Sequence, residues 1–300
     1  MRIVTRGDFD GLASTVLLTT VEDVREISFV HPKDAQDGKV AGCAEDIVVN
    51  LPYIKGCGLW FDHHISEEEK LSKLGSVKGR FEMAPSCARV IYNHYAREHA
   101  AKLAPFKELL EATDRLDSAQ LTKDDVLNPS GWILLGLTLD PRSGLGPEFQ
   151  KYFRWLAEYL KEVPVAKVLQ HPEVAPRTKR VLTEHAEFKK LLQQHARCEG
   201  QVIITDLRGL KNKPVGNRFL IYTLFPNANV EVRLFDGHQG AVVVAVGHSI
   251  FNRTCKVNVG QMLAQFGGGG HTGAGTAQLD PAGADKKIEK IIQICKENRE

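Results

Sequence analysis

Residues 1–21, MRIVTRGDFDGLASTVLLTTV, decide the fold of the amino-terminal half of this chain. The short run Ile3–Thr5 predicts a strand, which ends where the polar and glycine-containing stretch Arg6–Gly11 begins. The mostly apolar stretch Leu12–Val21 follows at once and predicts a helix. A strand, a short turn and a helix in this order are typical of a parallel sheet that is covered by helices.

The same alternation continues along the first half. Further short apolar runs predict strands at Glu26–Val30, Asp46–Leu51 and Leu59–Asp62. From Ser86 onward the pattern becomes helical, with Ser86 as a cap for one helix and Pro147 at the start of another. We therefore expect an α/β fold whose first domain is a mainly parallel sheet with helices on both faces.

A length of 300 residues is comfortable for two domains. The stretch from Val163 to Arg197 carries three prolines and then a charged helical pattern, which indicates a connector. After it the chain predicts more strands, a glycine cluster and a terminal amphipathic helix. We expect a catalytic domain at 1–165, a helical connector at 166–198 and a smaller α/β domain at 199–300.

The composition is that of an ordinary globular protein, with 43% hydrophobic and 25% charged residues. Its 39 lysines and arginines and 37 aspartates and glutamates leave a net charge of +2, so we expect no binding of long duplex DNA. The six cysteines lack zinc-ligand spacing and indicate a reducing compartment. Without a signal-peptide pattern or an apolar run long enough to span a bilayer, we expect a cytoplasmic protein with no membrane contact.

Polar side chains follow several of the predicted strands. Asp8 and Asp10, Asn50, and the triplet Asp62-His63-His64 each come just after a strand, and sites in such sheets form beyond the carboxyl ends of the strands. Two carboxylates in one turn can converge on Mg²⁺ or Mn²⁺, which prefer oxygen ligands. The alternatives are a solvated turn for the aspartates and a chance surface pair for the histidines.

Two further groups lie later in the chain. Asp114 ends a helical pattern, where an exposed charge is the alternative interpretation. The run Gly267–Gly270 before His271 lets the backbone pass close to a ligand and point amides at an anion, with a flexible loop as the alternative.

RGDFDG at 6–11, the triplet at 62–64, Asp114 and GGGGH at 267–271 occur in an order that resembles the DHH superfamily of phosphoesterases with its DHH-associated C-terminal domain. The resemblance covers nearly the whole chain. That superfamily includes RecJ-like exonucleases, oligoribonucleases that also cleave cyclic dinucleotides or phosphoadenosine phosphate, and exopolyphosphatases.

The resemblance implies a cleft in which the first domain holds manganese or magnesium and the second holds the substrate. It implies the metal-binding residues Asp8, Asp10, His63 and Asp114. It also implies that His64 faces the phosphate and that Asp62 orients a histidine or a water molecule. The implied substrate-binding residues are Arg253, Gly268, Gly269, Gly270 and His271, with a surface arginine as the alternative for Arg253.

The chain departs from this family at two positions. Where many members with two metal ions have a histidine and a bridging aspartate, it has Arg6 and Asn50. Arginine keeps its proton and is no ordinary ligand, and asparagine offers only a neutral carbonyl oxygen. We therefore expect one tightly bound Mn²⁺ or Mg²⁺, with Arg6 in place of the missing cation, paired with Asp8 and able to clamp a phosphoryl oxygen. The alternative is a site that has lost activity.

Together these features predict a metal-dependent phosphoric ester or anhydride hydrolase, with Arg6, Asp62 and His64 as its catalytic residues. The ion would lower the pKa of a water molecule that attacks phosphorus, and Arg6 and His64 would neutralise the charge that develops on the phosphoryl oxygens. The expected substrate is a short oligonucleotide, phosphoadenosine phosphate, a cyclic dinucleotide or polyphosphate. A catalytically weak sensor of phosphorylated nucleotides and a structural scaffold are the rival classes, and a homodimer is an open alternative to a monomer.

Overall fold

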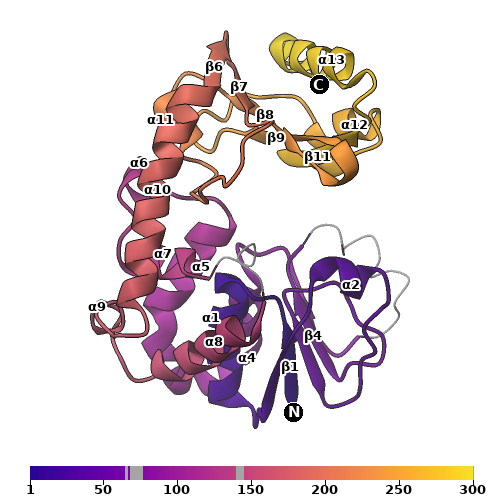
Figure 1. Ribbon diagram of the computed structural model, residues 1–300. Coiled ribbons are helices and arrows are strands. Elements are labelled where there is room, and N and C mark those ends of the chain that lie inside the picture. Colours follow the sequence, from indigo (N-terminus) through magenta and orange to yellow (C-terminus); the bar gives the residue numbers. More distant parts are fainter. Residues whose placement is uncertain (65–66, 68–76, 140–144, 300) are drawn as a thin grey trace. The chain divides into compact units, whose positions relative to one another are not determined.

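The computed structural model describes residues 1–64, 67, 77–139 and 145–299 (Figure 1). The chain forms two compact units. The first contains Met1–Gln120 and Pro129–Lys179, and the second contains Leu121–Asn128 and Arg180–Glu300. The domain boundaries expected after residues 165 and 198 stay a prediction. The catalytic role expected of the first domain and the substrate-binding role expected of the second also stay predictions.

The first unit is built around a five-stranded parallel sheet with the order β2-β1-β3-β4-β5. Its strands are β1 Arg2–Thr5, β2 Glu26–Phe29, β3 Asp46–Val49, β4 Leu59–Asp62 and β5 Gly79–Phe81. Successive side chains of a strand point to opposite faces, so the three central strands β1, β3 and β4 each contribute to two apolar clusters. Ile3 and Ile47 pack on one face, and Val4 and Val48 pack on the other. Burial on both faces explains why these strands are short, nearly continuous apolar runs.

Helices cover both faces of this sheet, as expected (Figure 1). The larger cluster lies between the sheet and helices α1, α4, α5 and α8, and the smaller one between the sheet and α2 with the loop after β3. The helices of the unit are α1 Phe9–Val21, α2 Pro32–Gln36, α4 Cys87–Leu103, α5 Lys107–Asp117, α7 Gly131–Leu137, α8 Pro147–Tyr159 and α9 Val165–Val168, with a short 3₁₀ turn η1 Ala104–Phe106. Helix α10 Ala175–His195 begins in this unit and continues into the second.

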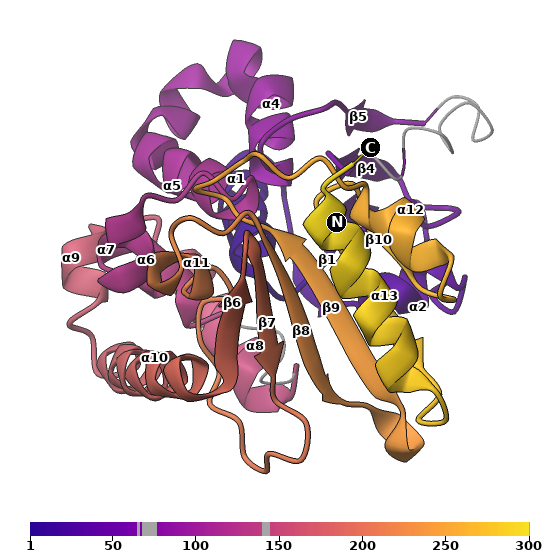
Figure 2. The same ribbon diagram turned by 90° about the horizontal axis from the view of Figure 1, so that it is seen from above.

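The second unit contains a six-stranded mixed sheet with the order β10-β11-β9-β8-β7-β6, of which Figure 2 shows β6 to β9 side by side. The strands are β6 Ala196–Glu199, β7 Val202–Asp206, β8 Val230–Asp236, β9 Val242–His248, β10 Gly269–His271 and β11 Ala274–Leu279. The pair β7–β8 is parallel and the other pairs are antiparallel. Helices α12 Val259–Ala264 and α13 Ala284–Glu297 pack on one face of the sheet. Helices α6 Lys123–Leu127 and α11 Ile221–Leu224 and the turn η3 His238–Gly240 complete the unit.

The α/β fold class is confirmed, and so are the expected strands and helix starts, within a few residues. Ser86 caps α4 through its side chain, and Pro147 is the first residue of α8. No helix in the described part of the chain is both long enough and apolar enough to span a membrane.

Candidate metal and phosphate site

The expected site residues of the first unit gather at one edge of its sheet. Strands β1, β3 and β4 are neighbours and run parallel, so the residues that follow them meet at their carboxyl ends. Asp8 follows β1, Asn50 follows β3, and His63 and His64 follow Asp62 at the end of β4. The sheet topology therefore joins motifs that lie about fifty residues apart in the chain.

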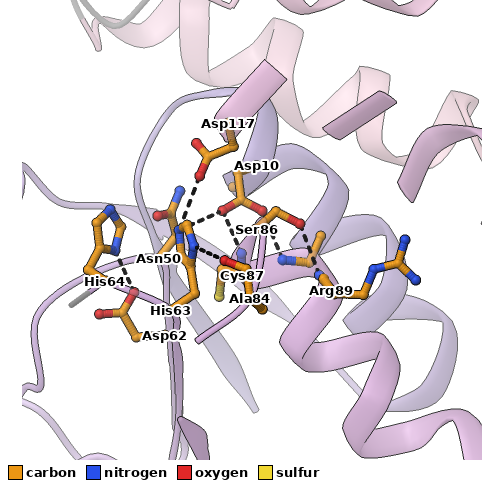
Figure 3. A network of polar contacts seen from close by, with 12 residues as sticks. Asp10, Asn50, Asp62, His63, His64, Ala84, Ser86, Cys87, Arg89 and Asp117 are labelled. Atoms are coloured by element: carbon orange, nitrogen blue, oxygen red, sulfur yellow. Dashed lines mark hydrogen bonds and ion pairs between the residues drawn. The ribbon is translucent and has the colours of Figure 1, made fainter. Parts of the chain in front are cut away.

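At the centre of the site, His63 lies between two carboxylates (Figure 3). Its Nε2 atom is 3.7 Å from an oxygen of Asp10 and 3.2 Å from an oxygen of Asp117. Its Nδ1 atom is 3.0 Å from the carbonyl oxygen of Ala84, which can only accept, so Nδ1 carries the hydrogen. The lone pair of a neutral His63 ring therefore points toward the two carboxylates, as a metal ligand requires.

Asp10 is held in place by the start of α4. Its two oxygens accept hydrogen bonds of 2.8 Å from the backbone N–H groups of Cys87 and Ala88, the first two residues of that helix. The side chain is buried, with 2% of the residue exposed. Burial and the nearby Asp117 carboxylate raise the pKa of Asp10 to about 7, although His63 opposes the shift.

The charge of His63 follows from the same neighbours. Burial on its own lowers the pKa of His63, but Asp117 and Asp10 raise it, with a result of about 9. In the absence of a metal ion, an imidazolium therefore provides the positive charge between the two carboxylates.

The donor set fits a divalent cation. Asp10, His63 and Asp117 each offer one ligand atom, and these atoms lie within 4.8 Å of one another. Among the described residues, two buried acceptors at this edge of the sheet make no hydrogen bond, Asp62 Oδ2 and Asn50 Oδ1. The contact of His63 Nε2 with Asp117 is an ion pair without hydrogen-bond geometry. Buried acceptors without a donor cost free energy, so their gathering indicates a place for a cation and its water molecules.

Asp8 is fully engaged with other groups. It caps α1, where its Oδ1 atom accepts from the Gly11 N–H at 2.9 Å and from the Asn50 side-chain amide at 3.0 Å. Its Oδ2 atom lies 2.9 Å from Nε of Arg6, so the expected pairing of Arg6 with Asp8 is present. Burial raises the pKa of Asp8, and Arg6 opposes that shift. Two hydrogen bonds to Oδ1 and the ion pair of Oδ2 with Arg6 thus already engage Asp8, and its expected role as a metal ligand stays a prediction.

Asp62 and His64 form a second pair beside the first. The Nδ1 atom of His64 lies 2.7 Å from an oxygen of Asp62, which is completely buried. Burial lowers the pKa of His64 and Asp62 raises it more, so the net shift is upward. About a third of the His64 side chain is exposed, which leaves its other nitrogen accessible to a substrate. This hydrogen bond fixes the ring of His64, and the catalytic role expected of Asp62 stays a prediction.

Asp114 does not join this group, contrary to the prediction from the sequence. Its carboxylate accepts from the Ser86 hydroxyl at 2.7 Å and forms a two-bonded ion pair with Arg89. Asp117, three residues later on α5, lies in the position expected of Asp114. Residues three apart share a helix face but differ by about 4.5 Å along the axis, enough to move a carboxylate out of a metal site.

The sequence contained the signal for Asp117, because the stretch Asp114–Asp117, DRLD, offers two carboxylates on one face. The sequence does not show which of them is neutralised by an arginine 25 residues earlier. Ser86 was expected only as a helix cap, and Arg89 was not singled out at all.

The glycines expected to bind substrate lie at the edge of the second sheet. Gly267, with φ of 78°, lies in the turn after α12, and its N–H and that of Gly268 donate to the last carbonyl oxygens of the helix. Gly268 and Gly270 have no room for a side chain, because a Cβ atom would come within 2.3 Å of a backbone oxygen of β11. Gly269 has no such neighbour.

His271 is exposed on β10, and Arg253 is exposed in a loop, where its Nε atom donates to the carbonyl oxygen of Ile250. The substrate-binding role of Arg253 and of Gly268 to His271 stays a prediction.

No family model and no curated protein sequence matches the chain. Among solved structures, it is similar to a pGpG-specific phosphodiesterase, PggH, from Vibrio cholerae, with 36% identity over 99% of both chains and a TM-score of 0.84. It is also similar to the DHH domain of a member of the s1p family of ribosomal proteins, with 12% identity over 100% of this chain and 87% of that one and a TM-score of 0.67. The second similarity is one of fold alone.

Proposed function

Because this chain belongs to the DHH superfamily of phosphoesterases, we propose that it hydrolyses a phosphodiester bond in a short oligonucleotide, with the linear dinucleotide pGpG as the first candidate. The observation that carries this proposal is the group of Asp10, His63 and Asp117, whose ligand atoms lie within 4.8 Å of one another at the carboxyl edge of the sheet. The 36% identity to a pGpG-specific phosphodiesterase over the full chain supports the choice of substrate.

We assign the metal site to Asp10, His63 and Asp117, with Mn²⁺ or Mg²⁺ as the ion because two of the three ligands are carboxylates. When bound, the ion supplies a water molecule of lowered pKa as the nucleophile. We propose a single tightly bound ion, because Asp8 is already engaged with Arg6 and Asn50. One divalent ion and Arg6 together balance the charge of Asp8, Asp10 and Asp117.

The remaining residues of the site act on the substrate. The Asp8 carboxylate pairs with the Nε atom of Arg6, which leaves the two terminal nitrogens of the guanidinium for a phosphoryl oxygen. Asp62 holds His64 by Nδ1, so that Nε2 of His64 remains for another phosphoryl oxygen. Fixed donors aimed at charge that develops in the transition state are each worth about 3 kcal/mol.

A hydrolysis assay tests this function. Purified protein with MnCl₂ is incubated with pGpG, phosphoadenosine phosphate, a cyclic dinucleotide and polyphosphate, and the products are separated by chromatography. We expect pGpG and one water molecule to give two molecules of GMP, with slower conversion of the other compounds. Binding of pGpG without turnover in Mn²⁺, Mg²⁺ or Co²⁺ would show a sensor instead, a role that the engaged Asp8 and the neutral Asn50 would suit.

Metal analysis tests the number of ions. We expect one Mn²⁺ per chain in the wild-type protein. The double substitution Arg6→His with Asn50→Asp adds an imidazole and a carboxylate beside a freed Asp8, so it should raise the count toward two. Two tightly held ions in the wild-type protein would contradict the assignment of Arg6 as a built-in cation.

A further inference from the structure

One short segment, residues 84–88, contacts two of the three proposed metal ligands. The carbonyl oxygen of Ala84 accepts from His63 Nδ1, and the N–H groups of Cys87 and Ala88 donate to Asp10. The position of this segment therefore sets the orientation of both ligands (Figure 3). The third ligand, Asp117, is carried by a different element, helix α5.

Asp114 joins that segment to α5. One of its oxygens accepts from the hydroxyl of Ser86, the residue that caps α4. The other accepts from two nitrogens of Arg89, which lies in the first turn of α4. The Ser86 oxygen also accepts from the backbone N–H of Arg89 at 3.1 Å. A single, mostly buried carboxylate thus fastens the first turn of α4 to α5, one turn before Asp117.

We propose that Asp114, with Ser86 and Arg89, is a positioning clamp for the metal ligands rather than a ligand itself. By holding α4 against α5, the clamp fixes the spacing between Asp10, which α4 orients, and Asp117, which α5 carries. Partners of this outer kind set the geometry of metal ligands, and their loss typically weakens metal binding about tenfold to a hundredfold. The inference rests on the proposed metal-dependent function and adds three residues to it.

The rival role, in which Asp114 is a direct metal ligand, predicts a different change in metal affinity when Ser86 or Arg89 is replaced. If Asp114 bound the ion, Ser86 and Arg89 would compete with the ion for its oxygens, and their removal would leave metal binding equal or tighter. In the clamp, removal of either partner loosens α4 and weakens binding. The variants Ser86→Ala and Arg89→Gln therefore separate the two roles.

The experiment measures the Kd for Mn²⁺ by titration calorimetry on the full chain, together with the Tm of the metal-free protein. We expect Ser86→Ala, Arg89→Gln and Asp114→Asn each to bind Mn²⁺ about tenfold more weakly, with a changed electron paramagnetic resonance line shape of the bound ion. The double variant Asp114→Asn with Arg89→Gln should lose little more than either single variant, because both substitutions break the same contact. If Asp114→Asn does not fold, Arg89→Gln tests the clamp in its place, because the Arg89 side chain is 27% exposed.

Glu111→Gln is the matched control, because it removes the same charge from the same helix at a side chain that is 57% exposed. It should bind Mn²⁺ like the wild-type protein. Unchanged or tighter binding in Ser86→Ala and Arg89→Gln, or a lowered Tm with an unchanged Kd, would overturn the clamp while leaving the proposed function intact. Failure of the wild-type protein to bind Mn²⁺ or to cleave pGpG would instead refute the proposed function.

Discussion

At the scale of single residues, His63 connects the backbone of the fold to the chemistry of the site. Its Nδ1 atom is fixed by Ala84, and its Nε2 atom faces Asp10 and Asp117. Burial alone would lower its pKa, so the rise to about 9 reflects the two carboxylates, which favour a positive charge at this position. A divalent ion can supply the same positive charge, so a proton and a metal ion compete for this site.

This competition predicts a pH dependence of metal binding. His63 must lose its proton to bind the ion, so below about pH 9 the apparent affinity for Mg²⁺ should fall about tenfold per pH unit. Protonation of Asp10, whose pKa is about 7, should steepen the fall below neutral pH. Calorimetry from pH 6.5 to 8.5 in buffers of different ionisation enthalpy measures both affinity and proton release. Affinity that is independent of pH, with no proton released, would contradict the assignment of His63 as a ligand.

A second residue-scale prediction concerns Asp117. Asp117→Asn removes one of the two anionic ligands and should reduce both Mn²⁺ binding and hydrolysis about a hundredfold or more. This loss is larger than the one expected for a residue of the clamp, which only positions the ligands. Asp23→Asn is the control, because Asp23 is exposed just before β2, at the opposite edge of the sheet. Both variants should keep the wild-type circular dichroism spectrum. Full activity in Asp117→Asn would show that the metal site is misplaced.

At the scale of elements, the starts of two helices build the site. Asp8 caps α1 and thereby holds Arg6, while the first amides of α4 hold Asp10. Helix starts carry unpaired N–H groups and a partial positive charge, so each stabilises a carboxylate that would otherwise be costly to bury. Of the three proposed metal ligands, Asp10 and Asp117 are therefore carried by helices, whereas His63 follows β4 in a loop and is held by Ala84 of another loop.

The glycines of the second sheet yield a prediction at the same scale. Gly268→Ala would place a Cβ atom 2.3 Å from the carbonyl oxygen of Thr276, so it should destabilise the protein by about 1–3 kcal/mol. Gly269→Ala is the matched control, because its Cβ would have no neighbour within 4 Å. Urea unfolding measures the difference. If the two variants were equally stable, close packing would not be the reason for glycine at position 268.

At the scale of the whole molecule, the net charge of +2 limits the kind of nucleic acid that the chain can hold. Long single strands are usually bound along a continuous basic path, with a binding strength that depends steeply on salt. A nearly neutral chain suits a short substrate better.

The corresponding prediction is a dependence on substrate length. The kcat/KM for 5′-phosphorylated oligonucleotides should be highest for the dinucleotide and should fall at least about tenfold, close to 1.4 kcal/mol, by a length of about five nucleotides. Rates are measured by chromatography at one fixed salt concentration, with a dinucleotide of another base sequence as the control for base preference. A kcat/KM that rises with length would favour a RecJ-like exonuclease.

The sequence by itself determined the fold class, most element positions and the order of the acidic and histidine motifs. Strand and helix patterns are local, and buried parallel strands are short apolar runs that are visible in one dimension. The motifs place Asp10 after β1 and His63 after β4, two parallel strands on either side of β3, so both residues lie at the carboxyl edge of the sheet.

Only the tertiary structure decided which carboxylate of DRLD reaches His63. Asp114 and Asp117 have the same local sequence signal, and the choice depends on Ser86 and Arg89, which lie at the start of another helix. The structure also showed that the amides of Gly267 and Gly268 end a helix. Side-chain direction and hydrogen-bond partners depend on contacts between distant segments, and no local pattern encodes them.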